Sequence, residues 1–159
     1  MFFLYNYCFF DIMWYNKNMR KSFLNSKFKS CNNSNFCFEL LYDRHKDYYT
    51  LNCLNADGEK MGYLTFKMNA GQKAWIYYVY TNEKFYHQGV GRALLQTFEK
   101  IAFENGIRFV EGKFYPENQY ARPLYNKTGY KIERDGYETL IYKTLEDEKF
   151  IESLEYERV

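Results

Sequence analysis

Two glycines lie where a predicted strand gives way to a predicted helix. The apolar run AWIYYVYT (74–81) leads through NEKFYH to QGVGRALL, which places Gly89 and Gly91 at the start of an amphipathic stretch. The first N–H groups of a helix have no intrahelical partner and carry a partial positive charge, and glycine lets a ligand approach them closely. The spacing predicts an anion site suited to a pyrophosphate, although the same turn can serve only to cap the helix.

A second pattern of polar and aromatic residues follows the next predicted strand, at 107–115. It reads N-x-x-A-x-x-L-Y-x-K-x-G-Y and contains Asn118, Tyr125 and Lys127. A tyrosine hydroxyl is neutral at pH 7 and can donate a proton. Two interpretations of Tyr125 stay open from the residues alone: a functional hydroxyl, or a core aromatic beside Leu124 on an amphipathic helix.

The composition indicates one soluble domain with its own hydrophobic core. The chain has 159 residues, of which 47% are hydrophobic and 22% aromatic, and its formal net charge is +2. A chain of this length can bury a core without disulfides or a structural metal. So small a net charge gives no general case for a nucleic-acid or membrane partner.

The two ends of the chain differ in charge. Residues 1–35 carry five basic side chains and one acid, whereas residues 146–159 carry six acids and two basic side chains. We interpret 1–35 as an atypical leader that either docks on the domain or is poorly ordered, with Met1 or Met19 as the native start. Residues 146–159 form an acidic tail whose apolar residues have helical spacing. A homodimer through this tail or the last strands stays open.

The cysteines and the apolar start of the chain bear on its location. Cys8, Cys31, Cys37 and Cys53 form no C-x-x-C pair and have no histidine at metal-ligand spacing, so we expect no metal site. Unpatterned cysteines of this kind fit a reducing cytosol. The run MFFLYNYCFFDIMWY is shorter than a membrane span and is interrupted by Asn6 and Asp11. We therefore expect a cytoplasmic protein.

Short strand signals succeed one another from Phe36 onwards. We predict strands at 36–43, 48–54, 60–68 and 74–81, a helix that stops at Asn105-Gly106, a strand at 107–115, a short helix at 118–127 and strands at 128–132 and 137–145. Short turns make the early strands antiparallel, and the long helix predicts one parallel crossover. The fold class is α/β (α+β): a mixed, mostly antiparallel sheet with a central parallel strand pair and flanking helices.

Aromatic side chains are concentrated in these predicted strands. They alternate across the sheet, so some face the core and others lie beside a cleft. A core position is favoured over a base-stacking surface, because few basic residues are interleaved with them. The aromatic residues concerned are Tyr77, Tyr78, Tyr80, Phe114 and Tyr115.

The two patterns described first occur in the order and spacing typical of one family. Residues 36–145 resemble the GNAT superfamily of acyl-CoA N-acyltransferases, in which the first pattern holds the CoA pyrophosphate and the second supplies a tyrosine beside the thioester sulfur. The resemblance implies a GNAT N-acetyltransferase domain over 36–145. The helix pair that commonly follows the first strand of this family has no periodic counterpart between Phe36 and Tyr48. This favours an open acceptor side and a bulky acceptor such as a protein or an RNA.

The resemblance also implies where acetyl-CoA binds. The family loop Q/R-x-x-G-x-G/A falls on Tyr86 to Gly91, with tyrosine in place of the usual Gln or Arg, so we expect weaker or altered CoA affinity rather than its loss. Backbone groups at 79–81 would pair with the pantetheine amides. The implied cofactor-binding residues are Val79, Tyr80, Thr81, Tyr86, His87, Gln88, Gly89, Val90, Gly91, Arg92, Asn118 and Lys127.

The implied reaction is direct transfer of an acetyl group from acetyl-CoA to a primary amine within a ternary complex. Tyr125 would be the general acid that protonates the CoA thiolate. The strand at 74–81 has no Asp or Glu, so Glu111 on the following strand is the nearest candidate for the general base. His87 and a water relay from backbone carbonyls are the alternatives.

Other functions stay open. A GNAT-like fold can also hold acyl-CoA or a protein partner without transfer, and Tyr86 together with the missing strand carboxylate slightly favours such a binding module. A nucleic-acid partner for the basic residues of 17–29 is disfavoured. The identity of the amine acceptor, a small molecule or a protein, is not specified by these patterns.

Overall fold

A computed structural model describes residues 27–29 and 35–145 of the chain. Within these ranges one mixed sheet has the strand order β1-β2-β3-β4-β5-β6-β8-β7. The strands are β1 Lys27–Lys29, β2 Cys37–Asp43, β3 Tyr48–Leu54, β4 Lys60–Asn69, β5 Lys73–Thr81, β6 Phe109–Phe114, β7 Lys131–Asp135 and β8 Glu138–Thr144. The helices are the 3-10 helix η2 Glu83–Phe85, α2 Val90–Glu104 and α3 Ala121–Lys127.

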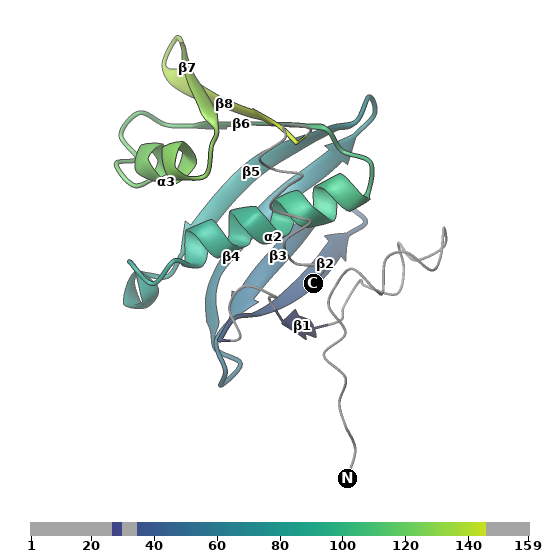
Figure 1. Ribbon diagram of the computed structural model, residues 1–159, viewed down its shortest axis with the longest axis vertical. Helices are drawn as coiled ribbons and strands as arrows, with labels where there is room; N and C mark the ends of the chain where they lie inside the picture. Colours follow the sequence, from purple (N-terminus) through teal and green to yellow (C-terminus); the bar gives the residue numbers. More distant parts are fainter. Residues whose placement is uncertain (1–26, 30–34, 146–159) are drawn as a thin grey trace, which may run out of the picture.

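The predicted fold class is confirmed. Every neighbouring strand pair is antiparallel except β5 and β6, which are parallel and joined through α2. α2 crosses one face of the sheet over β3, β4 and β5, while α3 lies near β7 (Figure 1). β2 and β3 are joined by a short turn, as predicted, without a helix pair between them.

One strand was not predicted. β1 lies inside the segment 16–35, which shows no sustained period, and its backbone pairs antiparallel with β2 at that edge of the sheet. Backbone pairing of this kind needs no side-chain pattern. The rest of the leader (1–26 and 30–34) and the acidic tail 146–159 lie outside the described residues, and so do Met19, Cys8 and Cys31.

The hydrophobic core lies between α2 and the sheet. The helix buries one stripe of side chains, among them Leu94, Leu95 and Phe98, and ends at Asn105, where Gly106 has a φ of 84°. The rings of Phe66 on β4 and Phe98 have their centroids 4.7 Å apart. The amphipathic period is therefore satisfied by the sheet. Within the described ranges, no helix combines the length and hydropathy that crossing a membrane requires.

A backbone irregularity separates β5 from β6. On one side β5 pairs with β4 as far as Thr81, with a register shift that leaves Tyr77 without a partner residue on β4. On the other side its pairing with β6 ends at Ile76, opposite Gly112. A bulge bends the strand that carries it. The two strands therefore diverge beyond Ile76, and their free edges face each other across a gap that helices and loops line.

A buried ion pair links three elements on the helical side of the sheet. The Lys143 ammonium on β8 lies 2.9 Å from an oxygen of the Glu99 carboxylate on α2. The same ammonium donates a hydrogen bond of 2.8 Å to the carbonyl of Thr128, at the C-terminal end of α3. It also lies over the ring of Tyr130. Glu99 and Lys143 thereby hold the end of α3 against α2.

We expect the effect of this ion pair on stability to appear mainly when one charge is removed and the other stays buried. Lys143→Met removes an ion-pair partner of a buried carboxylate, which typically costs about 3–5 kcal/mol of the free energy of unfolding. The double variant Glu99→Leu/Lys143→Met removes both charges and should lose much less. Urea denaturation of the three proteins measures the difference. Equal losses in the single and double variants would show that the charges themselves are not the cause.

Candidate functional site

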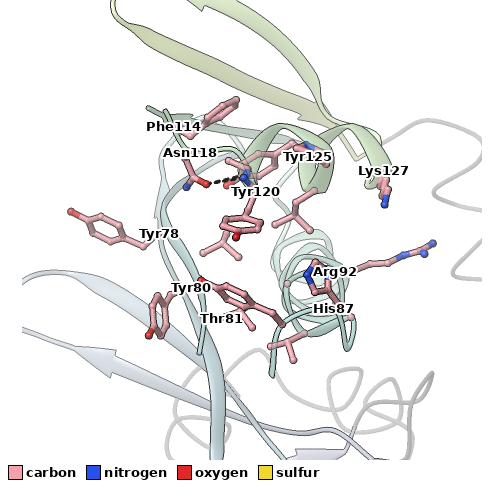
Figure 2. Close-up of a pocket in the computed structure, with 18 of the residues that line it drawn as sticks. Tyr78, Tyr80, Thr81, His87, Arg92, Phe114, Asn118, Tyr120, Tyr125 and Lys127 are labelled. Atoms are coloured by element: carbon pink, nitrogen blue, oxygen red, sulfur yellow. Dashed lines mark hydrogen bonds between the residues drawn. The ribbon is translucent and has the colours of Figure 1, made fainter. Parts of the chain in front are cut away.

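The gap between β5 and β6 holds a cavity of about 600 Å³. Its walls come from the end of β5, the loop 82–89, the first turn of α2, the end of β6 and α3 (Figure 2). Cofactor and small-molecule sites commonly measure about 300–1,000 Å³. The cavity is therefore large enough for an extended ligand, and it lies where both sequence patterns meet.

Most residues that the sequence singled out line this cavity. They are Val79, Tyr80, Thr81, Tyr86, His87, Gly89, Val90, Gly91, Arg92, Asn118, Tyr125 and Lys127. Gln88 belongs to the same loop but is not among the lining residues. Glu111 is not brought to the cavity: it lies opposite Trp75, where β5 and β6 still pair, and its carboxylate is 3.5 Å from the Lys73 ammonium.

The start of α2 presents unpaired backbone donors. Gly89 takes the left-handed conformation, with a φ of 80°, and no side chain caps the helix or places an acid in its first turn. The N–H of Ala93 is bonded to the carbonyl of Gly89 at 2.9 Å. The N–H groups of Val90, Gly91 and Arg92 have no partner within the described residues. They can bind an anion, and the helix dipole adds to the attraction.

Gly91 has a packing role that the sequence pattern did not reveal. A Cβ at this position would lie 3.2 Å from a methyl group of Leu124 on α3 and 3.8 Å from the Thr81 hydroxyl on β5. The missing side chain therefore lets the first turn of α2 pack against α3 and β5. Gly91 itself has no positive φ, so its requirement for glycine comes from this contact and not from its backbone conformation.

Tyr125 combines the two interpretations that the sequence left open. Its ring is buried between Phe114, at 5.7 Å between ring centroids, and Tyr130, at 5.3 Å. The residue also lines the cavity, and its hydroxyl makes no hydrogen bond within the described part of the chain. Burial raises the pKa of Tyr125 above its ordinary value, so the hydroxyl keeps its proton at neutral pH. It is a core aromatic whose polar end is available to a ligand.

Asn118 forms the turn that leads into α3. Its side-chain oxygen accepts hydrogen bonds from the N–H groups of Tyr120, at 3.2 Å, and Ala121, at 3.1 Å. The sequence predicted a helix from Asn118, but the helix begins at Ala121. Asn118 instead lies outside the helix and satisfies its first free N–H groups. Its side-chain NH₂ group has no protein partner within the described residues.

An aromatic contact crosses from the glycine loop to the start of α3. The rings of Tyr86 and Tyr120 have their centroids 5.2 Å apart, and both residues line the cavity. Burial, and then the nearby Glu83, raise the pKa of Tyr86 above its ordinary value. The resemblance described above led us to expect Gln or Arg at the position of Tyr86, so an aromatic contact stands where a polar side chain was expected. Tyr120 lies between the pattern residues Asn118 and Ala121, and its type alone did not single it out.

The aromatic strand residues divide between the core and the cavity, although a core position was favoured for them. Phe114 is buried, whereas Tyr77, Tyr78, Tyr80 and Tyr115 are exposed and line the cavity, the cleft-side position that was also expected for some of them. Beyond Ile76 the β5 tyrosines have no neighbouring strand on the β6 side, and Tyr115 lies just past the end of β6. Figure 2 shows Tyr78 on one side of the cavity, with Arg92 and Lys127 on the other.

The cysteines lie away from this chemistry. Cys37 and Cys53 are free thiols on β2 and β3, and neither lines the cavity. Burial raises the pKa of Cys53 to about 12, so it stays protonated. Within the described ranges, no three His, Cys, Asp or Glu side chains come together as metal ligands would.

Comparison with known proteins identifies a family and a fold. The model of the acetyltransferase (GNAT) family matches residues 13–130. The structure is similar to the PaiA N-acetyltransferase of Thermoplasma acidophilum in complex with coenzyme A, at 28% identity and a TM-score of 0.57, over 62% of this chain and 61% of that chain. The present chain therefore spans less than two thirds of the length of that protein.

Two more distant structures share the fold. An acetyltransferase of Bacillus subtilis in complex with CoA is 16% identical, with a TM-score of 0.56 over 63% of this chain and 78% of that one. An acetyltransferase of the GNAT family from Staphylococcus aureus is 12% identical, with a TM-score of 0.58 over 64% and 70%. A search among curated proteins found no match.

The packing of Gly91 gives a direct test of the cavity wall. Gly91→Val places new methyl groups against Leu124 and should lower the free energy of unfolding by about 1–3 kcal/mol. Because the Leu124 side chain, which lines the same cavity, must shift, CoA affinity should fall as well. Gln96→Val, on the same helix, controls for the lower helix propensity of valine. Urea denaturation and calorimetry measure the two effects, and a Gly91→Val protein that matches Gln96→Val in both would contradict this role.

Proposed function

Because the chain belongs to the acetyltransferase (GNAT) family, we propose that it is an N-acetyltransferase that moves an acetyl group from acetyl-CoA to a primary amine. One observation carries the proposal. A single cavity brings together the uncapped start of α2, the free edge of β5 and the hydroxyl of Tyr125. These are an anion site, a strand edge and a proton donor, and acetyl-CoA offers a complement to each.

Acetyl-CoA would occupy the cavity along its length. The pyrophosphate would accept hydrogen bonds from the N–H groups of Val90, Gly91 and Arg92, with the side chains of Arg92 and Lys127 adding positive charge. The pantetheine arm would lie along residues 79–81, where β5 has lost its partner on the β6 side. Strand-like pairing with the two pantetheine amides is the mode by which extended ligands add to a sheet edge. The thioester would then point toward Tyr125.

The proposed chemistry is direct attack of the amine on the thioester. The neutral amine nitrogen bonds to the carbonyl carbon, the carbon–sulfur bond breaks, and the CoA sulfur leaves as a thiolate. Tyr125 donates its proton toward this sulfur. The amine nitrogen loses one proton as the amide forms, and this proton restores the tyrosine hydroxyl through solvent. The products are the acetylated amine and the CoA thiol, so the protons balance.

The route of the amine proton does not involve Glu111 in this proposal. That carboxylate is ion-paired with Lys73 and does not line the cavity. His87 lines it but stands in the glycine loop, beside the proposed phosphate site. Water held by backbone carbonyls of the diverging part of β5 is therefore the route we propose.

A second function is favoured by one specific contact. The aromatic contact between Tyr86 and Tyr120 joins the glycine loop to the start of α3 at the cavity. Tyr86 thereby makes an aromatic contact where the resemblance implies Gln or Arg, and this departure favours a protein that holds acyl-CoA without transferring the acyl group. CoA binding without release of free thiol in the presence of any amine would support this binding module.

We also propose a cytoplasmic location, which the free thiols of Cys37 and Cys53 support.

The primary test is turnover. Purified protein, acetyl-CoA and a panel of amines should release free CoA thiol, which a thiol reagent detects. Calorimetry with CoA measures binding separately. A protein that neither binds CoA nor releases thiol with any amine would contradict the proposed function.

Removing one hydroxyl tests the role of Tyr125. Tyr125→Phe keeps the ring between Phe114 and Tyr130, so CoA affinity should stay near that of the unchanged protein, while kcat should fall by about 10²-fold, the lower end for general acid catalysis. Tyr142→Phe, on β8 outside the cavity, is the matched control. Because burial raises the pKa of Tyr125, kcat should show no alkaline decline from this group below about pH 10, the ordinary tyrosine pKa. An unchanged kcat would remove Tyr125 from the role.

Charge removal tests the placement of the phosphates. Arg92→Ala and Lys127→Ala should each weaken CoA binding by roughly threefold to tenfold at low salt, and by less at high salt, because exposed charges are screened. Lys46→Ala, in the turn between β2 and β3, removes an exposed lysine elsewhere and should have no effect. Calorimetry at two ionic strengths measures the change. Equal effects of all three substitutions would place the phosphates elsewhere.

A further inference from the structure

Five tyrosines with exposed rings line the same cavity. Their exposed fractions run from 43% to 69%, for Tyr77, Tyr78, Tyr80, Tyr115 and Tyr120. Three of them come from β5 beyond the point where it leaves β6, and two come from the segment between β6 and α3. An exposed apolar surface gathered around a cavity indicates a binding surface, since single exposed aromatics are usually scattered.

Three of these rings contact another aromatic ring of the protein. Tyr80 packs against Tyr63, with 5.3 Å between ring centroids, and Tyr77 lies 6.5 Å from Tyr48. Tyr120 packs against Tyr86 in the same way. A ring that is fixed on one face and free on the other loses little conformational entropy when a ligand stacks on it.

Tyr78 and Tyr115 are the most exposed of the five. Neither makes a ring contact within the described residues, although both line the cavity. Tyr78 lies opposite Thr65, next to the bulge at Tyr77. These two rings therefore have free faces on the open side of the cavity.

The charges around the cavity argue against a strongly cationic acceptor. The ionisable side chains of Lys, Arg and His that line it are His87, Arg92, Lys113 and Lys127, and no Asp or Glu from the described ranges joins them. Lys113 is held by Glu138, at 2.8 Å, and Asp135, at 3.7 Å, so these carboxylates are already engaged. A polyamine with several ammonium groups would find no carboxylate on this lining to pair with, while a ring with one amine would meet tyrosine faces.

We infer that the acceptor is an amine carrying an aromatic ring, which stacks on the tyrosines of the open side while the amine reaches the thioester. This inference rests on the proposed function and assigns the acceptor class for the same cavity. Two sources supply this chemistry, a free aromatic amine and a polypeptide whose first residue is aromatic. An aromatic pair contributes about 0.5–1.5 kcal/mol beyond the area that it buries, which corresponds to roughly twofold to tenfold in kcat/KM for each ring.

Matched amines test the inference. 2-Phenylethylamine and 2-cyclohexylethylamine have the same reach and similar apolar bulk, but only the first can stack as an aromatic ring. With saturating acetyl-CoA, kcat/KM should be about tenfold higher for the aromatic amine, the upper value for one aromatic pair, and higher still relative to spermidine. The tetrapeptides Phe-Gly-Ser-Gly and Ser-Gly-Ser-Gly distinguish the sources. If the phenylalanine peptide exceeds phenylethylamine, a polypeptide is the source, and the reverse order identifies a small amine.

Variants connect this preference to the tyrosines. Tyr78→Leu and Tyr115→Leu should reduce the preference for the aromatic amine severalfold and leave KM for acetyl-CoA unchanged. Tyr137→Leu, a control that removes an exposed tyrosine outside the cavity, should leave the preference as it was.

The outcomes separate the two proposals. Faster acetylation of spermidine, equal rates for the two matched amines, or a preference unaffected by Tyr78→Leu and Tyr115→Leu would overturn the inference and leave the proposed function intact. Release of no thiol with any amine would refute the proposed transfer and the inference with it.

Discussion

The divergence of β5 and β6 after Ile76 is the constraint on which the rest of the cavity depends. Two parallel strands that pair along their whole length leave no space between them. Here the bulge at Tyr77 bends β5 while its other edge stays paired with β4 as far as Thr81. The backbone groups facing β6 are thereby free, and the loops and helices that follow both strands line the opening.

The helices depend on close contacts that keep this opening in shape. Gly91 lets the first turn of α2 approach Leu124 on α3, and at the other end of the contact the Glu99–Lys143 ion pair holds the end of α3 against α2. A buried ion pair is a poor source of stability compared with apolar packing, but removing one of its charges alone is costly. The anion site and the Tyr125 hydroxyl are thus parts of one packed unit.

The sequence by itself determined the order and type of the strands and α-helices from Phe36 to Leu145, although not the 3-10 helix Glu83–Phe85. The apolar residues alternate in the strands and recur with helical spacing in α2, and the turns between them are short, so local physics and connection length sufficed. The glycine loop and the pattern from Asn118 to Tyr130 also identified about half of the cavity-lining residues. The residues of the two patterns lie at the ends of strands and helices, and these ends come together at the cavity.

Only the tertiary structure decided which side chains share the cavity. Glu111 lies on the strand next to β5, but pairing with β5 persists at that level, so its carboxylate stays with Lys73. Tyr78 is exposed where β6 no longer pairs with β5, and Tyr115 is exposed just beyond the end of β6. Which side chains are exposed depends on where β5 and β6 separate, and so does the approach of Tyr120 to Tyr86. The alternation of side chains along one strand carries no information about the position of the neighbouring strand.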